Sequence, residues 1–370
     1  MGLIAMQIKT EDEDKTLRLN ATEFMATQKK VRHSYLPAEW EEQSAIQLTW
    51  PHAGTDWAYM LDEVTACFKQ IAREIAKREP LIIVTPEPEV VKEQLEDLTN
   101  ITFFTCPTND TWARDHGFIT TVNEQGPELV DFRFNGWGQK FASNLDNQIC
   151  RRMAEAKLLN GKYKDCLDFV LEGGSIESDG CGTLLTTTEC LTAPNRNEPL
   201  DQPQIEARLK DEFKLQQVIW LNHGYLAGDD TDSHVDTLAR LCPMDTIAYV
   251  QCLDKDDEHY EQLRLMEEDL RRARTLKGEP YRLLALPMAD PVFEDGERLP
   301  ATYANFLIMN KAVLYPTYNQ PENDQKAKEV LQEAFPTREI VGIDCRALIK
   351  QHGSLHCVTM QFPKDVFYNL

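Results

Sequence analysis

Amphipathic helices alternate with apolar strands in this chain. In residues 57–79 apolar side chains recur at helical spacing, and the apolar run at 80–86 predicts a buried strand directly after the helix. Four more helix-then-strand units are predicted: 145–158 with 167–172, 203–214 with 217–221, 259–276 with 281–286, and 323–335 with 339–343. The helices of these four units begin roughly 55 to 65 residues apart, a spacing that indicates repeated structural units.

Pairs of short strands lie between these units. The predicted pairs are 118–122 with 128–134, 174–178 with 182–187, 234–239 with 246–251, and 303–309 with 312–316. The C-terminal strand at 356–362 has no partner nearby in the sequence, so we expect it to pair with the N-terminal strand at 44–50. That pairing would close five α/β units into a ring without exposed sheet edges. An open mixed sheet with helices on both faces is the alternative architecture.

Length and composition predict one large globular domain. Of the 370 residues, 42% are apolar, which is ordinary for a folded protein. Residues 1–34 are polar and mixed, so we predict an N-terminal extension there, followed by a single domain at 35–370. No stretch reaches the roughly 18 unbroken apolar residues of a membrane span.

The chain is strongly acidic, with a formal charge of -22 from 61 Asp and Glu against 39 Lys and Arg. This charge repels nucleic acid and anionic membranes and favours a small cationic partner. Ten scattered cysteines without a C-x-x-C pair indicate reduced thiols and a cytoplasmic protein. The sequence does not decide whether the chain forms a homo-oligomer.

Four polar, glycine-containing motifs fall at predicted strand ends, where loops usually carry function. They are NDTWARDHG (109–117), LEGGSIESDG (171–180), GDDTDSHVD (228–236) and HGSLHCVT (352–359). In the third motif, strand alternation would place His234 and Asp236 on the same face. That pair could bind a metal ion with one further ligand. It could also combine a general acid and base with a carboxylate that grips a cation, or be purely structural.

Cys357 has two interpretations. Unpaired cysteines are among the most buried residues, so packing explains this one as well as nucleophilic chemistry does. An unperturbed thiol is only about 3% thiolate at pH 7, so a nucleophile needs a cation or a base nearby. Strand alternation predicts that His356 points away from Cys357, so a base must come from elsewhere in the chain. His234 could serve if the five units close into a ring. His352 and His356 lie four residues apart, but Gly353 argues against a helical metal site there.

Single carboxylates in these motifs also have ordinary explanations. Asp115 beside Arg114 is consistent with a local ion pair. Glu172 is consistent with an exposed acid at a strand end, and Asp230 and Asp232 with turn residues.

The chain contains seven motifs in order: LPAEWEEQSAIQLTWP, NDTWARDHG, FNGWGQKF, EGGSIESDGCGTLLTTTECLTAPNRN, GDDTDSHVDTLAR, ATYANFLIMN and HGSLHCVTMQFP. Together they resemble the agmatine deiminase family, which is grouped with bacterial peptidylarginine deiminases. The similarity runs from about Leu36 to Pro363. It implies the α/β fold of the guanidine-modifying superfamily, a five-bladed α/β propeller of ββαβ units with pseudo-fivefold symmetry.

The resemblance also implies roles for seven residues. These are Cys357 as nucleophile, His234 as general acid and base, Asp115 and Asp236 as guanidinium-binding carboxylates, Glu172 as the group that orients the histidine, and Asp230 and Trp112 as further substrate contacts. Asp230 is expected to meet the amine at the far end of the substrate. Neither a metal ion nor an organic cofactor is implied.

The implied reaction converts agmatine and water to N-carbamoylputrescine and ammonia through a covalent amidino-thioether. The alternatives are a peptidylarginine or other guanidine deiminase, a non-catalytic guanidine- or polyamine-binding protein, and a metal hydrolase. The chain departs from the family pattern at residues 350–354, which lack a glycine-rich run, and at Ser233, Phe118 and Gln139. These departures bear on pocket shape and therefore on the choice of substrate.

Overall fold

The computed structural model describes residues 34–368, so the N-terminal extension predicted at 1–34 lies outside the described residues apart from Ser34. Five of the sheets repeat one order, in which an antiparallel strand pair is followed, across a helical connection, by a strand that runs parallel to the second. The chain therefore has a mixed α/β fold built from separate sheets, not one continuous mixed sheet.

The five sheets use strands in the following combinations. The first contains β1 (Ser34–Tyr35), β5 (Ile119–Asn123), β6 (Gly126–Arg133) and β7 (Lys162–Val170). The second contains β8 (Ile176–Ser178), β9 (Thr183–Thr187) and β10 (Gln217–Leu221), and the third contains β11 (Ala239–Cys242), β12 (Thr246–Gln251) and β13 (Arg282–Pro287). The fourth contains β16 (Leu307–Ile308), β17 (Ala312–Thr317) and β18 (Glu339–Asp344), and the fifth contains β19 (Thr359–Pro363), β2 (Gln43–Thr49), β3 (Leu81–Thr85) and β4 (Ile101–Thr105). A separate ribbon pairs β14 (Phe293–Glu294) with β15 (Glu297–Arg298).

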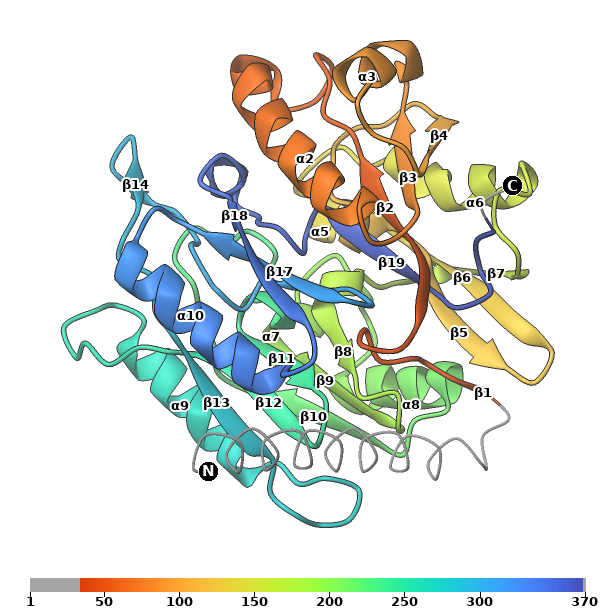
Figure 1. The fold of residues 1–370 in the computed structure, drawn as a ribbon. Helices are drawn as coiled ribbons and strands as arrows, with labels where there is room; N and C mark the ends of the chain where they lie inside the picture. Colours follow the sequence, from red (N-terminus) through yellow and green to blue (C-terminus); the bar gives the residue numbers. More distant parts are fainter. Residues whose placement is uncertain (1–33, 369–370) are drawn as a thin grey trace, which may run out of the picture.

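The longer helices connect the parallel strands and lie toward the periphery of the molecule (Figure 1). They are α2 (Leu61–Ala76), α3 (Pro88–Gln94), α6 (Ile149–Glu155), α8 (Gln202–Phe213), α9 (Tyr260–Arg272) and α10 (Pro321–Ala334). In α2 Val64, Phe68 and Ile71 of the predicted apolar stripe are fully buried, whereas Leu61 at the start of the helix is partly buried. Burial of each such side chain contributes about 1.5–3 kcal/mol. Within residues 34–368, no helix combines the length and apolar character needed to cross a membrane.

The predicted pairing between the two ends of the chain is confirmed. β19 runs antiparallel to β2, with Thr359 opposite Leu48 and Phe362 opposite Ala45. Figure 1 shows β19 beside β2 in the middle of the molecule. This pairing gives the C-terminal strand a partner and brings the segment before it, which carries Cys357, into the centre of the fold.

Two strand predictions around the polar motifs are wrong. His234 and Asp236 do not lie on a strand, because Val235–Thr237 form a 3₁₀ helix (η5) and β11 begins only afterwards. Residues 355–358 form a turn before β19. In that turn the backbone N–H groups of His356 and Cys357 donate to Oδ1 of Asn305, at 2.8 and 3.3 Å, instead of to a neighbouring strand.

Two further strand boundaries differ. β7 begins at Lys162, before the predicted start at residue 167. The prediction missed the first residues of the strand because most of them are polar and not fully buried, so hydropathy alone does not reveal them. The predicted strand at 303–309 is reduced to β16, and the residues before it are buried without regular pairing.

Candidate active site

Short irregular segments from different sheets bring the predicted residues together. Asp115 lies on α4 (Ala113–His116), Glu172 precedes the 3₁₀ helix η4 (Gly173–Ser175), His234 precedes η5, and Cys357 lies in the turn before β19. The backbone N–H of Arg114 donates to the carbonyl of Cys357 at 3.2 Å. This hydrogen bond fixes the aspartate-bearing helix against the cysteine turn.

Gly174 lies where three of the predicted side chains converge. A Cβ added at Gly174 would lie 2.6 Å from Nδ1 of His234, 2.9 Å from Oδ1 of Asp115 and 3.2 Å from Oδ2 of Asp236. Nδ1 of His234 is itself 3.7 Å from Oδ1 of Asp115. Only glycine leaves room for these groups to approach one another around a backbone segment.

Asp115 is held by two donors. Its Oδ1 accepts the backbone N–H of Gly174 at 3.1 Å, and its Oδ2 accepts the indole N–H of Trp137 at 3.0 Å. Burial, with the nearby charges of Asp236 and Glu172 and against that of His234, raises the pKa of Asp115 to about 6. The predicted local ion pair between Asp115 and Arg114 is wrong, because Nη2 of Arg114 instead lies 3.8 Å from Oε2 of Glu39.

Asp236 keeps one oxygen available. Its Oδ2 lies 2.7 Å from Nδ1 of His356 and accepts the side-chain amide of Asn305 at 3.2 Å. Its Oδ1 has no hydrogen-bond partner among the described residues. Burial opposes ionisation, but the contacts with His356 and His234 lower the pKa of Asp236 below its usual value. An ionised carboxylate with a free oxygen is suited to a cationic N–H donor.

His356 belongs to a buried ionic network behind Asp236. Its Nε2 lies 2.7 Å from Oε2 of Glu39, which also accepts Arg240 at 2.9 Å, and Arg240 in turn donates to Glu177. Strand alternation predicted that His356 points away from Cys357. The residue lies in a turn and not on a strand, and its ring contacts Asp236 and Glu39. It supports Asp236 from behind.

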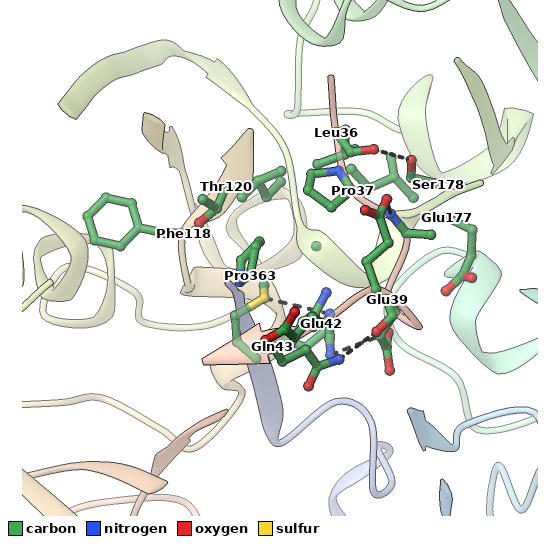
Figure 2. A pocket seen from close by; sticks show the side chains of 18 residues that line it. Leu36, Pro37, Glu39, Glu42, Gln43, Phe118, Thr120, Glu177, Ser178 and Pro363 are labelled. Atoms are coloured by element: carbon green, nitrogen blue, oxygen red, sulfur yellow. Dashed lines mark hydrogen bonds and ion pairs between the residues drawn. The ribbon is translucent and has the colours of Figure 1, made fainter. Parts of the chain in front are cut away.

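Figure 2 shows a separate pocket that borders this ionic network, with Glu39 and Glu177 in its lining. None of the seven predicted site residues lines it. The carboxylates that face it already have donors, since Glu39 and Glu177 both pair with Arg240. The predicted chemistry belongs to a different cavity.

That cavity contains Cys357 together with Asp115, Trp112 and Asp230, four of the seven predicted residues. The thiol of Cys357 donates to Oδ1 of Asn305 at 3.4 Å. Burial and the charges of Asp236 and Asp115 raise the pKa of Cys357 well above that of an ordinary thiol. Cys357 is therefore held as a neutral thiol as long as both aspartates are ionised and no bound cation neutralises them.

His234 and Glu172 lie deeper, and both are fully buried. Burial opposes a charged ring, but Asp115, Cys190 and Asp236 raise the pKa of His234 well above its usual value. The interpretation of Glu172 as an exposed acid is wrong: its Oε1 accepts Nε of Arg196 at 3.0 Å. Its Oε2 and both ring nitrogens of His234 have no hydrogen-bond partner among the described residues. Glu172 thus lies near the histidine without a direct hydrogen bond to it.

The outer part of the cavity is acidic. Asp230 lines it as predicted, and Asp56 and Asp110 line it as well. Burial, against the charge of His352, raises the pKa of Asp230 to about 6, and burial likewise raises that of Asp110 to about 7. Trp112 forms one wall, with its indole N–H donated to Asp110 at 3.0 Å.

The divergent segment 350–354 keeps one essential feature. A Cβ at Gly353 would lie 2.2 Å from the ring of Trp112. The glycine therefore allows the segment to pack flat against the tryptophan and complete the cavity, even without a glycine-rich run.

Sequence reasoning missed several residues that hold the site together. They are Asn305, His356, Trp137, Glu39, Arg240, Cys190 and Arg196. Asn305, Cys190 and Arg196 fall inside the motifs ATYANFLIMN and TTTECLTAPNRN, which was the available signal. Their individual roles depend on contacts between segments that are distant in the sequence.

Comparison with solved structures identifies enzymes of similar fold. A Porphyromonas gingivalis protein described provisionally as an arginine deiminase is 50% identical, with a TM-score of 0.86 over 90% of this chain and 100% of that one. A cysteine-to-serine variant of C. jejuni agmatine deiminase with substrate bound is 39% identical, with a TM-score of 0.85 over 90% and 97% of the two chains. A Marinomonas relative named provisionally as an agmatine deiminase is 33% identical over 89% of this chain and 94% of its own.

These matches place the chain among the hydrolases that act on C–N bonds of linear amidines. The family can be stated more closely. The chain belongs to the Porphyromonas-type peptidyl-arginine deiminase family, whose sequence profile matches residues 35–363.

Proposed function

We propose that this protein is a cysteine-dependent hydrolytic deiminase that converts agmatine and water to N-carbamoylputrescine and ammonia. The observation that carries the proposal is the convergence of His234, Asp115 and Asp236 around Gly174, with Asp115 also lining the cavity of Cys357. The names of the relatives support the same chemistry.

The proposed fold is a five-bladed α/β propeller in which the five ββαβ units surround a common axis with pseudo-fivefold symmetry. The repeated strand order supports it, as does the pairing of β2 with β19, which supplies the last unit with strands from both ends of the chain. In that arrangement the short segments that carry the site face one central cavity.

Recognition begins with charge. A guanidinium is a planar cation with N–H donors in a fixed fork, and carboxylates hold it through charge-assisted hydrogen bonds. Asp236 offers Oδ1, which has no partner among the described residues, and Asp115 presents its carboxylate 3.7 Å from His234. The bound cation relieves the repulsion between two buried carboxylates.

The same cation activates the nucleophile. In the free protein burial and both aspartate charges raise the pKa of Cys357. A guanidinium between Asp115 and Asp236 cancels these charges, which lowers the cost of forming the thiolate beside the substrate carbon. Substrate binding thus promotes the reactive form of Cys357.

In the proposed cycle the thiol of Cys357 loses its proton to solvent, and the thiolate attacks the guanidinium carbon. His234 donates a proton to the departing nitrogen, which leaves as ammonia. A positively charged amidino-thioether remains on Cys357. His234 then takes a proton from water as the water oxygen bonds to the same carbon. Cleavage of the C–S bond releases the ureido product and restores the thiol. Neither a metal ion nor an organic cofactor takes part.

Substrate choice follows from the outer cavity. Three carboxylates, Asp56, Asp110 and Asp230, line it, and no lysine or arginine does so among the described residues. The terminal amine of agmatine would meet opposite charge there, with Asp230 as its proposed partner, whereas the α-carboxylate of free arginine would be repelled. Peptidyl-arginine deimination is the second candidate, because the matching family profile carries that activity in its name.

The decisive comparison supplies agmatine, free arginine and a peptidyl-arginine at equal concentration and measures ureido product from each. We expect the highest kcat/KM with agmatine. A higher kcat/KM with the peptide would indicate a peptidyl-arginine deiminase instead of an agmatine deiminase. Binding of agmatine without any product would instead indicate a non-catalytic guanidine-binding protein. Loss of turnover after treatment with a chelator would contradict the metal-free cycle.

A further inference from the structure

Three metal-binding side chains meet beside the proposed active cavity. A carboxylate oxygen of Glu172, Sγ of Cys190 and a ring nitrogen of His234 all lie within 4.8 Å of one another. All three residues have no exposed surface. Cysteine sulfur, imidazole nitrogen and carboxylate oxygen are the three donor types that bind Zn²⁺ in proteins.

Several of the atoms in this cluster that could bind a metal have no hydrogen-bond partner among the described residues. Oε2 of Glu172 and both ring nitrogens of His234 lack a hydrogen-bond partner among residues 34–368, although buried polar atoms are almost always paired. The other oxygen of Glu172 accepts Arg196. Metal-ligating carboxylates are commonly held in this way by a hydrogen bond to the oxygen that does not bind the metal.

A second cluster of potential metal ligands, with two glutamates and a histidine but no cysteine, provides a contrast. Donor atoms of Glu39, Glu177 and His356 also lie within 4.8 Å of one another. There, however, the carboxylates accept Arg240 and backbone N–H groups, and both ring nitrogens of His356 face carboxylates at 2.7 Å. Arginine occupies the place of a cation in that cluster, so it offers no free ligand atoms.

The first cluster is also pre-organised by its surroundings. Cys190 lies on the short helix α7 (Thr188–Leu191), which is capped by the hydroxyl of Thr187. That hydroxyl donates to the carbonyl of Ser233 at 2.7 Å, and Oγ of Ser233 donates to Glu189 at 3.2 Å. The segment that carries the thiol is thus fastened to the residue directly before His234.

We propose that Glu172, Cys190 and His234 form a binding site for a thiophilic divalent cation such as Zn²⁺, and that the bound ion inhibits the enzyme. Binding displaces the thiol proton of Cys190 and any proton on the coordinating nitrogen of His234, and both leave to solvent. The metal then occupies the imidazole that should move protons during deimination. Hard cations such as Mg²⁺ prefer all-oxygen sites and would not compete.

Metal binding itself does not depend on the proposed function; only its inhibitory effect rests on it. The two are therefore tested separately. Co²⁺ serves as a spectroscopic substitute for Zn²⁺, because a thiolate ligand produces a charge-transfer band that a spectrometer records without any turnover. Cys357→Ser and Cys190→Ser provide matched variants of the two thiols nearest the chemistry.

We expect full-length protein to develop the thiolate-to-Co²⁺ band, Cys357→Ser to retain it, and Cys190→Ser to lose it. Added Zn²⁺ should bleach the band. Zn²⁺ should also inhibit agmatine turnover reversibly. Cys190→Ser should raise the half-inhibitory Zn²⁺ concentration by at least about tenfold, because the loss of even a residue that only hydrogen-bonds to a metal ligand weakens metal binding by about that factor. The inhibited rate of Cys190→Ser is compared with the metal-free rate of the same variant.

Two results would overturn the proposal. One is the absence of a Co²⁺ band at concentrations well above that of the protein. The other is a band lost in Cys357→Ser and kept in Cys190→Ser, which would assign the metal to the proposed nucleophile. If Cys190→Ser does not fold, Glu172→Gln replaces it, because glutamine keeps the side-chain shape and can still accept Arg196. The Cys190 thiolate remains in this variant, so the band should form but should require a higher Co²⁺ concentration. A band without any deiminase activity would leave the metal site standing and contradict only the proposed function.

Discussion

Gly174 determines how closely the proposed proton-transfer and guanidinium-binding groups can approach. Its missing side chain leaves space shared by Nδ1 of His234 and the carboxylates of Asp115 and Asp236. The sequence marked this position only as one of two glycines after a glutamate, a pattern equally typical of a turn. The roles proposed for Cys357, His234 and the two aspartates come from the family resemblance, whereas the position of the glycine between three of these side chains comes from the structure.

Gly174→Ala should reduce kcat/KM for agmatine by about 10²-fold, since displacement of a catalytic group by about 1 Å has an effect of that size. The added methyl group would push the ring of His234 away from Asp115. Gly54→Ala is the control, because a Cβ there meets only the partly buried side chain of His52, and neither residue lines the cavity. Steady-state kinetics with circular dichroism to verify folding measures the effect; unchanged kinetics in Gly174→Ala would contradict the site geometry.

The raised pKa of Asp115, about 6, gives the reaction an acid limb. Above this pH the carboxylate is ionised and can pair with the guanidinium; below it the group is protonated and the pairing is lost. Since kcat/KM reports ionisations of the free enzyme, it should fall as the pH drops through about 6. Asp230 has a similar pKa, so Asp230→Asn is needed as a control and should retain the limb. A profile flat down to pH 5 in folded protein would contradict the raised pKa of Asp115.

Among the elements, regular helices were predictable and the site segments were not. The predicted ranges 203–214, 259–276 and 323–335 correspond to α8, α9 and α10, because their apolar stripes face the core. The segments around His234 and Cys357 were predicted as strands on the same kind of evidence. Their course is instead set by side chains from elsewhere, such as Asn305, which accepts backbone N–H groups of the cysteine turn. Local hydropathy does not encode such contacts.

Asp146 illustrates how one side chain outside the cavity shapes a site segment. Its two carboxylate oxygens accept the backbone N–H groups of Asn109 and Asp110, at 2.7 and 3.0 Å, in the loop that leads to Trp112. Asp146→Ala removes both acceptors and should lower the free energy of unfolding by about 2 kcal/mol. It should also raise KM more than it lowers kcat, because Trp112 and Asp110 line the cavity. Denaturant titration and kinetics measure the two effects; unchanged stability would show that the loop is held by other contacts.

For the molecule as a whole, the pairing of β2 with β19 joins the two ends of the described chain into one sheet. The sequence predicted this pairing from a strand that lacked a local partner. The formal charge of −22, by contrast, did not indicate where a cationic substrate binds. In the structure Asp56, Asp110 and Asp230 line the cavity that also contains the thiol of Cys357. A cation attracted by the overall field therefore meets carboxylates at the entrance and deeper inside.

The proposed role of Cys357 as the nucleophile in agmatine deimination can be tested by substitution. Formation of N-carbamoylputrescine and ammonia should be measured for the unmodified protein, Cys357→Ala and Cys252→Ala between about pH 6 and 9. Cys252 is also buried but does not line the cavity. We predict that the unmodified protein and Cys252→Ala form N-carbamoylputrescine and ammonia in equal amounts and at the same rate. Cys357→Ala should form neither product. Turnover by Cys357→Ala at the unmodified rate would exclude Cys357 as the nucleophile. The absence of product from the unmodified protein at every pH would exclude deimination of agmatine.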